Sequence, residues 1–311
     1  MWLVVGWVAL GTSCAVEDFF FAGKRGGPYR FDAIDPQVDG DLSAPHPSPI
    51  PITMIEEGFV SIESGERVHW VFAKQKEPHL PLILYHHGNG PHIGRFWDRV
   101  EILWLLGHPV VIYDYPGFGL SEGSPSEEGC YRAGLAVLRM LSQREDIDAH
   151  KITHYGFSMG SAIAFEVVGR TLEEREKNPS SPLQAPLALI GENGWCSIEE
   201  MARDATFLKI PGFIVSKMRF DACARLERFP SFPILLFHGL RDRVVPPRQL
   251  ALLEQRARIP LRTVRIPEAS HADLPIAGEP YSPWVKAQGV PTPSVIYVNT
   301  LRDFFNSMAS P

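Results

Sequence analysis

The sequence predicts an α/β fold, in which helices cover both faces of a mostly parallel, twisted sheet of about eight strands. Three observations support this prediction. Short, continuous apolar runs recur along the chain, as is typical of strands that are buried on both faces of a sheet. Segments of helical length separate these runs, and parallel strands need such crossover connections. Polar residues that could carry chemistry follow several of the runs, where catalytic groups gather in sheets of this kind.

The expected elements follow one another in a regular order. Apolar and polar side chains alternate around a Ser64-Gly65-Glu66 turn, which predicts two strands at residues 58–63 and 67–73. Continuous apolar runs predict strands at residues 81–87, 109–114, 152–155, 187–190 and 234–237, and alternation predicts a last strand at 261–266. The intervening segments predict helices at residues 94–106, 126–143, 158–177, 246–257 and 295–308. Strands that alternate with helices indicate right-handed βαβ units and a doubly wound sheet.

Composition divides the chain into three parts. Residues 1–16 contain no charged side chain and are expected to form a signal or lipid-anchor segment. Residues 17–57 are expected to form an extended linker, because alternate prolines from Pro45 to Pro51 disfavour both helix and central strand. Residues 58–311 hold all the predicted strands and helices, so we expect them to fold as the catalytic domain.

Composition also argues against several classes of protein. The 311-residue chain has a formal net charge of −6, whereas proteins that follow nucleic-acid phosphates usually carry a basic surplus. No run reaches the roughly 18 apolar residues of a membrane-spanning helix. Four cysteines in a chain of this length do not form a disulfide scaffold.

The N-terminal segment ends in Gly11-Thr12-Ser13-Cys14, and small residues before a cysteine suit a lipoprotein signal. Cys14 would then carry a lipid and hold the protein at a membrane of a bacterial cell envelope. Two features depart from the pattern of a lipoprotein signal. Position 11, three residues before the cysteine, is Gly where Leu is usual, and no basic residue precedes the apolar run. The alternative is an apolar strand or helix at the start of a cytoplasmic protein. If Cys14 is lipidated, three cysteines remain and at least one thiol stays unpaired.

Ser158 lies at the centre of Gly156-Phe157-Ser158-Met159-Gly160, a G-x-S-x-G motif between a predicted strand and a predicted helix. In such a tight turn the serine adopts strained backbone angles and projects its hydroxyl above the sheet. Glycine is needed two residues to either side because side chains there would collide. The helix N-terminus also favours the negative charge that develops in acyl transfer. The motif therefore predicts that Ser158 is a nucleophile.

Gly88-Asn89 follows the predicted strand at residues 81–87, which ends in His86-His87. We expect the backbone N–H groups of Asn89 and Met159 to bind the oxyanion of the reaction, because fixed donors need no reorganisation as charge forms. The alternative interpretation is a simple Gly-rich turn. The neighbouring histidines lack the spacing of known metal motifs, so no metal site is expected.

Asp242 and His271 each follow a predicted strand. His271 is expected to take the proton from Ser158, and Asp242 is expected to accept the imidazole N–H and fix the tautomer. Asp242 is flanked by two arginines, so a surface Arg–Asp pair is the alternative. Asp273 is a rival acid by proximity, although sequence neighbours rarely orient each other's side chains.

The chain order Ser158, Asp242, His271 and the motifs around these residues resemble the α/β-hydrolase superfamily. The segment Asp114–Ser121 also resembles the D-x-x-G-x-G-x-S loop of that family, and the match runs from residue 58 to the C-terminus. The chain looks closest to compact members without a large lid, such as prolyl-oligopeptidase-like domains, esterases and acyl-protein thioesterases, because the segment 194–233 is too short for a full cap domain. Some relatives carry the acid after an earlier strand, which makes Glu192 a second candidate for the acid.

The resemblance implies a serine hydrolase that cleaves carboxylic esters or thioesters through an acyl-enzyme, without a cofactor. Its partner would be a small-molecule ester or thioester, and Trp195 and Phe118 are candidates to line an acyl pocket. Two alternatives stay open, namely a peptidase or amidase on the same machinery and a catalytically silent binding module. The sequence leaves open the natural substrate, the acyl length and the oligomeric state.

Overall fold

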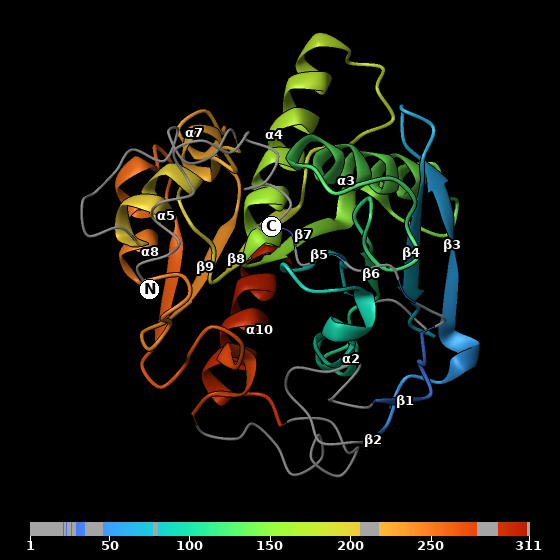
Figure 1. Ribbon diagram of the computed structural model, residues 1–311, viewed down its shortest axis with the longest axis horizontal. Coiled ribbons are helices and arrows are strands. Elements are labelled where there is room, and N and C mark those ends of the chain that lie inside the picture. The colour runs from blue at the N-terminus through green and yellow to red at the C-terminus, as the bar shows by residue number, and fades with distance from the viewer. Residues whose placement is uncertain are drawn as a thin grey trace, which may run out of the picture.

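The computed structural model describes residues 21, 23, 26, 29–34, 46–76, 80–205, 218–278 and 292–309. An open eight-stranded sheet runs through the molecule in the order β10-β9-β8-β7-β5-β6-β4-β3 (Figure 1). The pairings from β10 to β6 are parallel, whereas β4 and β3 join the edge as antiparallel strands. This arrangement confirms the predicted mostly parallel sheet. The strands are β3 (Ile55–Ser61), β4 (Arg67–Ala73), β5 (Leu82–His86), β6 (Val110–Tyr113), β7 (Ile152–Phe157), β8 (Ala188–Glu192), β9 (Ile234–Gly239) and β10 (Arg262–Ile266).

Helices cover both faces of the sheet (Figure 1). The helices α2 (Trp97–Leu105) and α10 (Val295–Ala309) contribute side chains to the apolar cluster on one face. On the other face the clusters include side chains of α3 (Glu127–Ser142), α4 (Met159–Lys177) and α8 (Arg248–Arg256). The shorter helices are α5 (Ile198–Ala205), α7 (Ala222–Leu226) and the 3₁₀ turns η1 (Ile52–Met54), η2 (Ile93–Phe96), η3 (Ala149–Lys151) and η4 (Leu274–Ile276).

Burial on both faces explains why the predicted strands are continuous apolar runs. In β5, Ile83 and Tyr85 belong to the cluster that contains side chains of α2 and α10. Their neighbours Leu82 and Leu84 belong to the opposite cluster, which contains side chains of α3 and α4. Because successive side chains of a strand point to opposite faces, a strand covered on both sides needs apolar residues at every position.

Part of the segment that we predicted as a linker packs against the domain. The strands β1 (Ala33–Ile34) and β2 (His46–Pro47) form a small antiparallel sheet. The buried His46 imidazole Nε2 lies 2.7 Å from Glu101 Oε2 on α2. The strand β3 begins at Ile55 because its pairing with β4 extends to that residue, so the predicted boundary at residue 58 falls within a strand.

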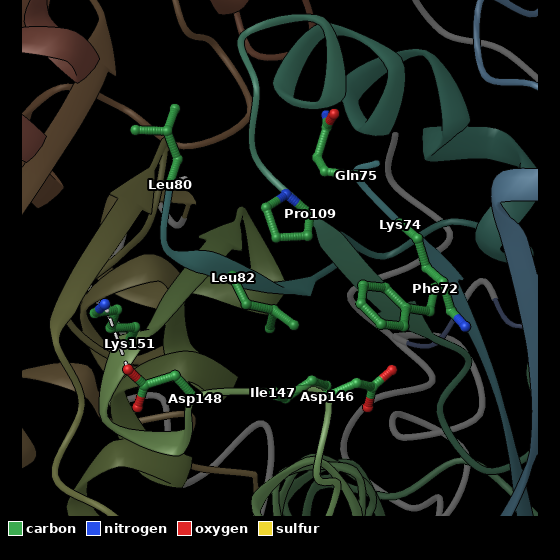
Figure 2. Close-up of a pocket in the computed structure, with 10 residues that line it drawn as sticks. All are labelled: Phe72, Lys74, Gln75, Leu80, Leu82, Pro109, Asp146, Ile147, Asp148 and Lys151. Atoms are coloured by element: carbon green, nitrogen blue, oxygen red, sulfur yellow. Dashed lines mark ion pairs between the residues drawn. The ribbon is translucent and has the colours of Figure 1, made fainter. Parts of the chain in front are cut away.

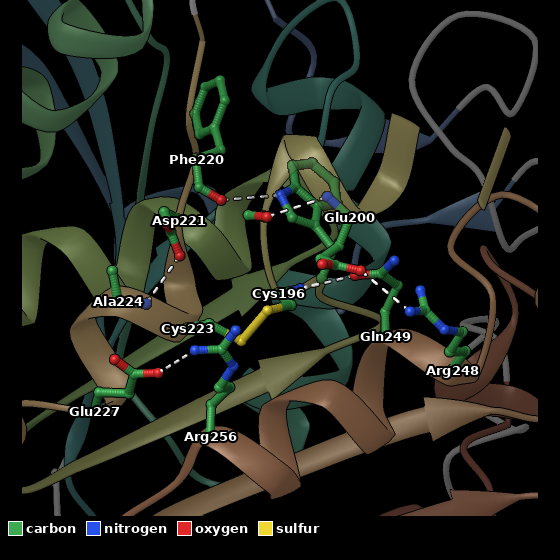
Figure 3. Close-up of a disulfide and its surroundings, with 12 residues drawn as sticks. Cys196, Glu200, Phe220, Asp221, Cys223, Ala224, Glu227, Arg248, Gln249 and Arg256 are labelled. Atoms are coloured by element: carbon green, nitrogen blue, oxygen red, sulfur yellow. Dashed lines mark hydrogen bonds and ion pairs between the residues drawn. A yellow bond between two sulfur atoms is a disulfide. The ribbon is translucent and has the colours of Figure 1, made fainter. Parts of the chain in front are cut away.

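The insertion between β8 and β9 is short. In the described chain it contains α5 and α7, and a disulfide joins Cys196, which precedes α5, to Cys223 in α7 (Figure 3). The pairing leaves Cys130 on α3 as a buried free thiol. No helix within the described ranges combines the length and the hydropathy needed to cross a membrane.

Candidate active site

Ser158 occupies a sharp turn between β7 and α4. Its φ of 54° and ψ of −119° lie outside the regions that a non-glycine residue normally adopts. A Cβ atom on Gly156 would lie 2.3 Å from the carbonyl oxygen of Gly160, and a Cβ atom on Gly160 would lie 1.9 Å from the carbonyl oxygen of His86. Both positions therefore exclude any side chain, which is the steric reason for the G-x-S-x-G pattern. The predicted helix begins one residue later, at Met159, because Ser158 is not helical.

The structure brings Ser158, His271 and Asp242 together. The Nε2 atom of His271 lies 2.9 Å from Ser158 Oγ, and its Nδ1 atom lies 2.7 Å from Asp242 Oδ2. The other carboxylate oxygen of Asp242 accepts hydrogen bonds from the N–H groups of Val244 and Val245, each at 2.8 Å. The Asp242 side chain is fully buried, whereas that of His271 is 17 % exposed. This geometry allows His271 to take a proton from Ser158 while Asp242 orients the ring.

The two rival carboxylates have other partners. Asp273 Oδ1 accepts a hydrogen bond from the N–H group of Ser270, so this side chain shapes the loop that carries the histidine. Glu192 is buried at the end of β8, and its Oε2 accepts a hydrogen bond from the Tyr155 hydroxyl at 2.7 Å. Burial raises the pKa of the Glu192 carboxyl above its usual value. The acid that contacts His271 is therefore Asp242.

The loops that carry Met159 and Asn89 follow two strands that are neighbours in the sheet. The strand β5 pairs with β7 so that His86 lies opposite Gly156. Because the two strands are parallel, both loops start at the same end of the sheet, where the strands have their carboxyl ends. Met159 is the first residue of α4, where backbone N–H groups lack partners within the helix. The chain before Asn89 is held in place, since the Tyr115 hydroxyl donates to the carbonyl oxygen of His87 at 2.7 Å. The arrangement is compatible with an oxyanion site at these two residues.

Sequence reasoning missed Asn193, which bridges the loops of the acid and the base. Its Oδ1 accepts a hydrogen bond from the N–H group of Gly239 at 2.8 Å, at the start of the Asp242 loop. Its Nδ2 donates to the carbonyl oxygens of Ser270 and His271, at 3.2 and 2.8 Å. Asn193 is fully buried and has a φ of 47°. The available signal was an amide residue directly after a buried strand, at the edge where site residues gather.

Arg99 of α2 gives the His271 loop a second support. Its guanidinium donates to the carbonyl oxygen of Ala272, the residue after the histidine. The guanidinium carbon also lies 4.4 Å from the centroid of the Phe157 ring, which packs 5.2 Å from the imidazole ring of His271. The backbone of this loop is therefore held from two directions, by Asn193 and by Arg99.

The two candidates for an acyl pocket lie in the apolar cluster that also contains Met159. Phe118 is fully buried, and its ring centroid lies 5.8 Å from that of His87 in the loop before Asn89. Trp195 is 5 % exposed, and its indole N–H donates to the carbonyl oxygen of Phe220 at 3.2 Å. Both residues are therefore buried on the same face of the sheet as Met159.

Cys14 and the segment 1–16 lie outside the described residues. Among the described residues, no group of three or more His, Cys, Asp or Glu side chains is placed to hold a metal ion.

A pocket of about 340 Å³ opens beside Phe72, Leu82 and Pro109 (Figure 2). It lies at the amino ends of the parallel strands, whereas Ser158 lies at their carboxyl ends, so the pocket is on the opposite side of the molecule from Ser158.

Comparisons with known proteins agree with this architecture. A family model described as the alpha/beta hydrolase fold matches residues 81–180. The alpha/beta hydrolase domain-containing protein WAV2 of Arabidopsis thaliana is 31 % identical over 259 residues, which cover 76 % of this chain and 79 % of that protein. The uncharacterized protein YfhR of Escherichia coli strain K12 is 26 % identical over 62 % of this chain and 64 % of its own length. An esterase of Pyrococcus furiosus, Pf2001, superposes with a TM-score of 0.61 over 92 % of this chain and 100 % of its own, at 13 % identity, and so shows the fold alone.

Proposed function

This chain belongs to the α/β-hydrolase family, and we propose that within the family it is a serine hydrolase that cleaves carboxylic esters or thioesters through an acyl-enzyme. The observation that carries the proposal is the hydrogen-bonded series from Ser158 Oγ through His271 to Asp242, at 2.9 and 2.7 Å. A buried acid, an imidazole and a serine in a strained turn form the arrangement that activates a hydroxyl for attack on an acyl carbon. The esterase fold of the structural neighbour is compatible with this chemistry.

The proposed reaction uses side chains and backbone groups of this chain alone. Ser158 Oγ attacks the acyl carbon while His271 Nε2 takes the hydroxyl proton. Met159 and Asn89 donate backbone N–H groups to the oxyanion, and Asp242 stabilises the imidazolium. His271 then gives the proton to the departing alcohol or thiol. In the second half of the reaction, His271 removes a proton from water, which attacks the acyl carbon. The bond between that carbon and Ser158 Oγ then breaks, His271 returns the proton to Oγ, and the acid is released.

A series of p-nitrophenyl esters, from acetate to palmitate, tests this function. We expect turnover that depends on Ser158 and is greatest at one acyl length. The variant Ser158→Ala should lose about 10⁴- to 10⁶-fold in kcat with its melting temperature retained, because it removes the attacking oxygen. Undiminished turnover by Ser158→Ala would place the chemistry elsewhere.

The same experiment separates the alternatives. Turnover of amides without turnover of esters would favour a peptidase or amidase. If folded protein neither turns over esters or amides nor reacts with a fluorophosphonate at Ser158, the silent binding module is the better account.

We also propose that the mature protein resides in the cell envelope, held by a lipid on Cys14. The disulfide between Cys196 and Cys223 supports this location, because disulfides persist in oxidising compartments and are rare in the cytosol (Figure 3). Mass spectrometry of protein isolated from its host tests both points. We expect a diacylglyceryl mass on a peptide that begins at Cys14, and a bridged peptide pair at Cys196 and Cys223. An intact Met1 together with alkylatable thiols at both positions would instead indicate the cytoplasm.

A further inference from the structure

We propose that the apolar side chains beside Ser158 form a binding site for an aromatic acyl group, and that Phe21 of the N-terminal segment occupies this site in the present structure. The inference deepens the proposed function, because it names the acyl class that this site would accept. We assign the wall of the site to Phe118, Met159, Trp195, Met218, Phe220 and Val245, six members of the large apolar cluster that covers the α3 and α4 face of the sheet.

The position of this wall follows from the residues that carry it. Met159 comes directly after Ser158, and the N–H group of Val245 donates to the Asp242 carboxylate. Trp195 comes two residues after Asn193, which holds the loop of His271. The cluster is therefore attached to the nucleophile and to both loops that carry its partners. An acyl chain bonded to Ser158 Oγ would have its apolar end next to these side chains.

The ring of Phe21 contacts two parts of this wall. Its centroid lies 6.2 Å from that of Phe118, with the ring planes at 90°, and 6.2 Å from that of Phe220, at 65°. Phe220 in turn packs edge to face with Trp195, at 6.3 Å. Such edge-to-face geometry is favourable for an aromatic guest because the ring edge is positive and the ring face negative. Phe21 is only 8 % exposed, so its ring occupies a site that is sealed from water.

Gly23, Gly26 and Tyr29 also contact this side of the molecule. A Cβ atom on Gly23 would lie 2.8 Å from the Phe118 ring, so the backbone at Gly23 lies directly against this ring. Further along, the N–H group of Gly26 donates to the carbonyl oxygen of Gly119 at 3.1 Å, and the Tyr29 hydroxyl is hydrogen-bonded to Asp114. These contacts bind Gly26 and Tyr29 to the loop that follows β6. Removal of the Phe21 side chain would leave an apolar, aromatic-lined space of the kind that takes up a benzene-like group.

Phe31 supplies a matched control in the same segment. It is 6 % exposed, but its ring packs against Trp97 in the cluster on the opposite face of the sheet. Phe21→Ala and Phe31→Ala therefore remove the same ring at similar burial, and only the first removes it from the wall beside Ser158. Both variants should melt at lower temperature than the parent, so a stability loss by itself does not distinguish them.

The experiment uses the full-length protein and two esters, p-nitrophenyl acetate and p-nitrophenyl 3-phenylpropionate. We expect Phe21→Ala to raise the ratio of kcat/KM for phenylpropionate over acetate by about tenfold, mainly through a lower KM, since the ester no longer competes with the Phe21 ring. Phe31→Ala should leave this ratio unchanged. An unchanged ratio in Phe21→Ala, or an equal rise in both variants, would overturn the proposal.

A binding measurement keeps the test independent of catalysis. If no Ser158-dependent turnover of either ester is found, the proposed function fails, and free 3-phenylpropionate is then used as the probe. We expect it to raise the melting temperature of Phe21→Ala and not that of Phe31→Ala or the parent protein. The absence of such a shift in Phe21→Ala would overturn the aromatic site itself.

Discussion

The two carboxylate oxygens of Asp242 have different hydrogen-bond partners, and this leaves one of them for His271. Oδ1 accepts the N–H groups of Val244 and Val245, which leaves Oδ2 to accept from the imidazole. An amide at this position could still accept the two backbone N–H groups through its oxygen. It would then present N–H rather than oxygen to His271 Nδ1, which would stabilise the wrong tautomer of the ring.

We therefore expect Asp242→Asn to lower kcat by about 10³- to 10⁴-fold while the protein stays folded. The measurement is turnover of the best p-nitrophenyl ester, with a thermal melt alongside. Asp273→Asn is the control, because that carboxylate bonds to the Ser270 N–H group and not to the ring. If both variants lost activity equally, Asp242 would not be the acid of the site.

Asn193 connects the two loops that carry Asp242 and His271. Its side chain holds the Asp242 loop and the His271 loop together, so its loss should misplace both without removing a reacting group. We expect Asn193→Ala to lower kcat by about 10- to 100-fold with little change in KM. Asn178→Ala, at the distant end of α4, is the control and should keep the parent kcat. A parent-like kcat in Asn193→Ala would show that the two loops hold their positions without it.

Between elements, the disulfide closes the segment from β8 to α7. Cys196 and Cys223 lie 27 residues apart in sequence and are both buried. A crosslink over a loop of this length lowers the entropy of the unfolded chain and stabilises the fold by about 3 kcal/mol. Cys196 directly follows Trp195, so the same bond tethers the Trp195 backbone to α7.

We expect a reducing agent to lower the midpoint of guanidinium unfolding by an amount that corresponds to about 3 kcal/mol. The double variant Cys196→Ser, Cys223→Ser should match the reduced parent and should not respond to the reductant. Cys130 is buried and unpaired, so it provides no second bond within the described chain. An equal response of the double variant to the reductant would mean that the effect does not come from this bond.

Element types followed from local pattern, whereas element ends depended on contacts. The apolar runs predicted the buried parallel strands because each side chain of such a strand is covered. The start of β3 at Ile55 came instead from pairing with β4, which no local pattern encodes. The helix α4 begins at Met159 because the turn places Ser158 at a positive φ.

Across the whole molecule, several histidines are buried in their neutral form. Burial lowers the pKa of His87 to about 4, that of His108 to about 4 and that of His154 to about 3. In the unfolded chain these rings titrate near 6.5. Between pH 6.5 and 4 the unfolded state therefore binds more protons than the folded state, so stability must fall as the pH falls through this window.

We expect the free energy of unfolding to decrease below pH 6.5, with a slope of up to about 1.4 kcal/mol per pH unit for each such histidine. Urea unfolding at pH 7.5, 6.5, 5.5 and 4.5 measures this slope. His108→Asn removes one titrating ring while an amide can still donate to the carbonyl oxygen of Pro81, and it should give a shallower slope. A stability that is flat between pH 7 and 5 would contradict the neutral buried state.

The sequence by itself determined the sheet, its helices and the strained turn at Ser158, because these depend on periodicity and on sterics between residues close in the chain. It also placed Asp242 and His271 at strand ends, where a parallel sheet gathers polar groups. Only the tertiary structure decided between Asp242, Glu192 and Asp273 as the partner of the imidazole, since that choice depends on which oxygen lies 2.7 Å from Nδ1. The bridging role of Asn193, the pairing of Cys196 with Cys223 and the placement of Phe21 against Phe118 belong to the same category. Each joins segments distant in sequence, and such contacts exist only once the whole chain has packed.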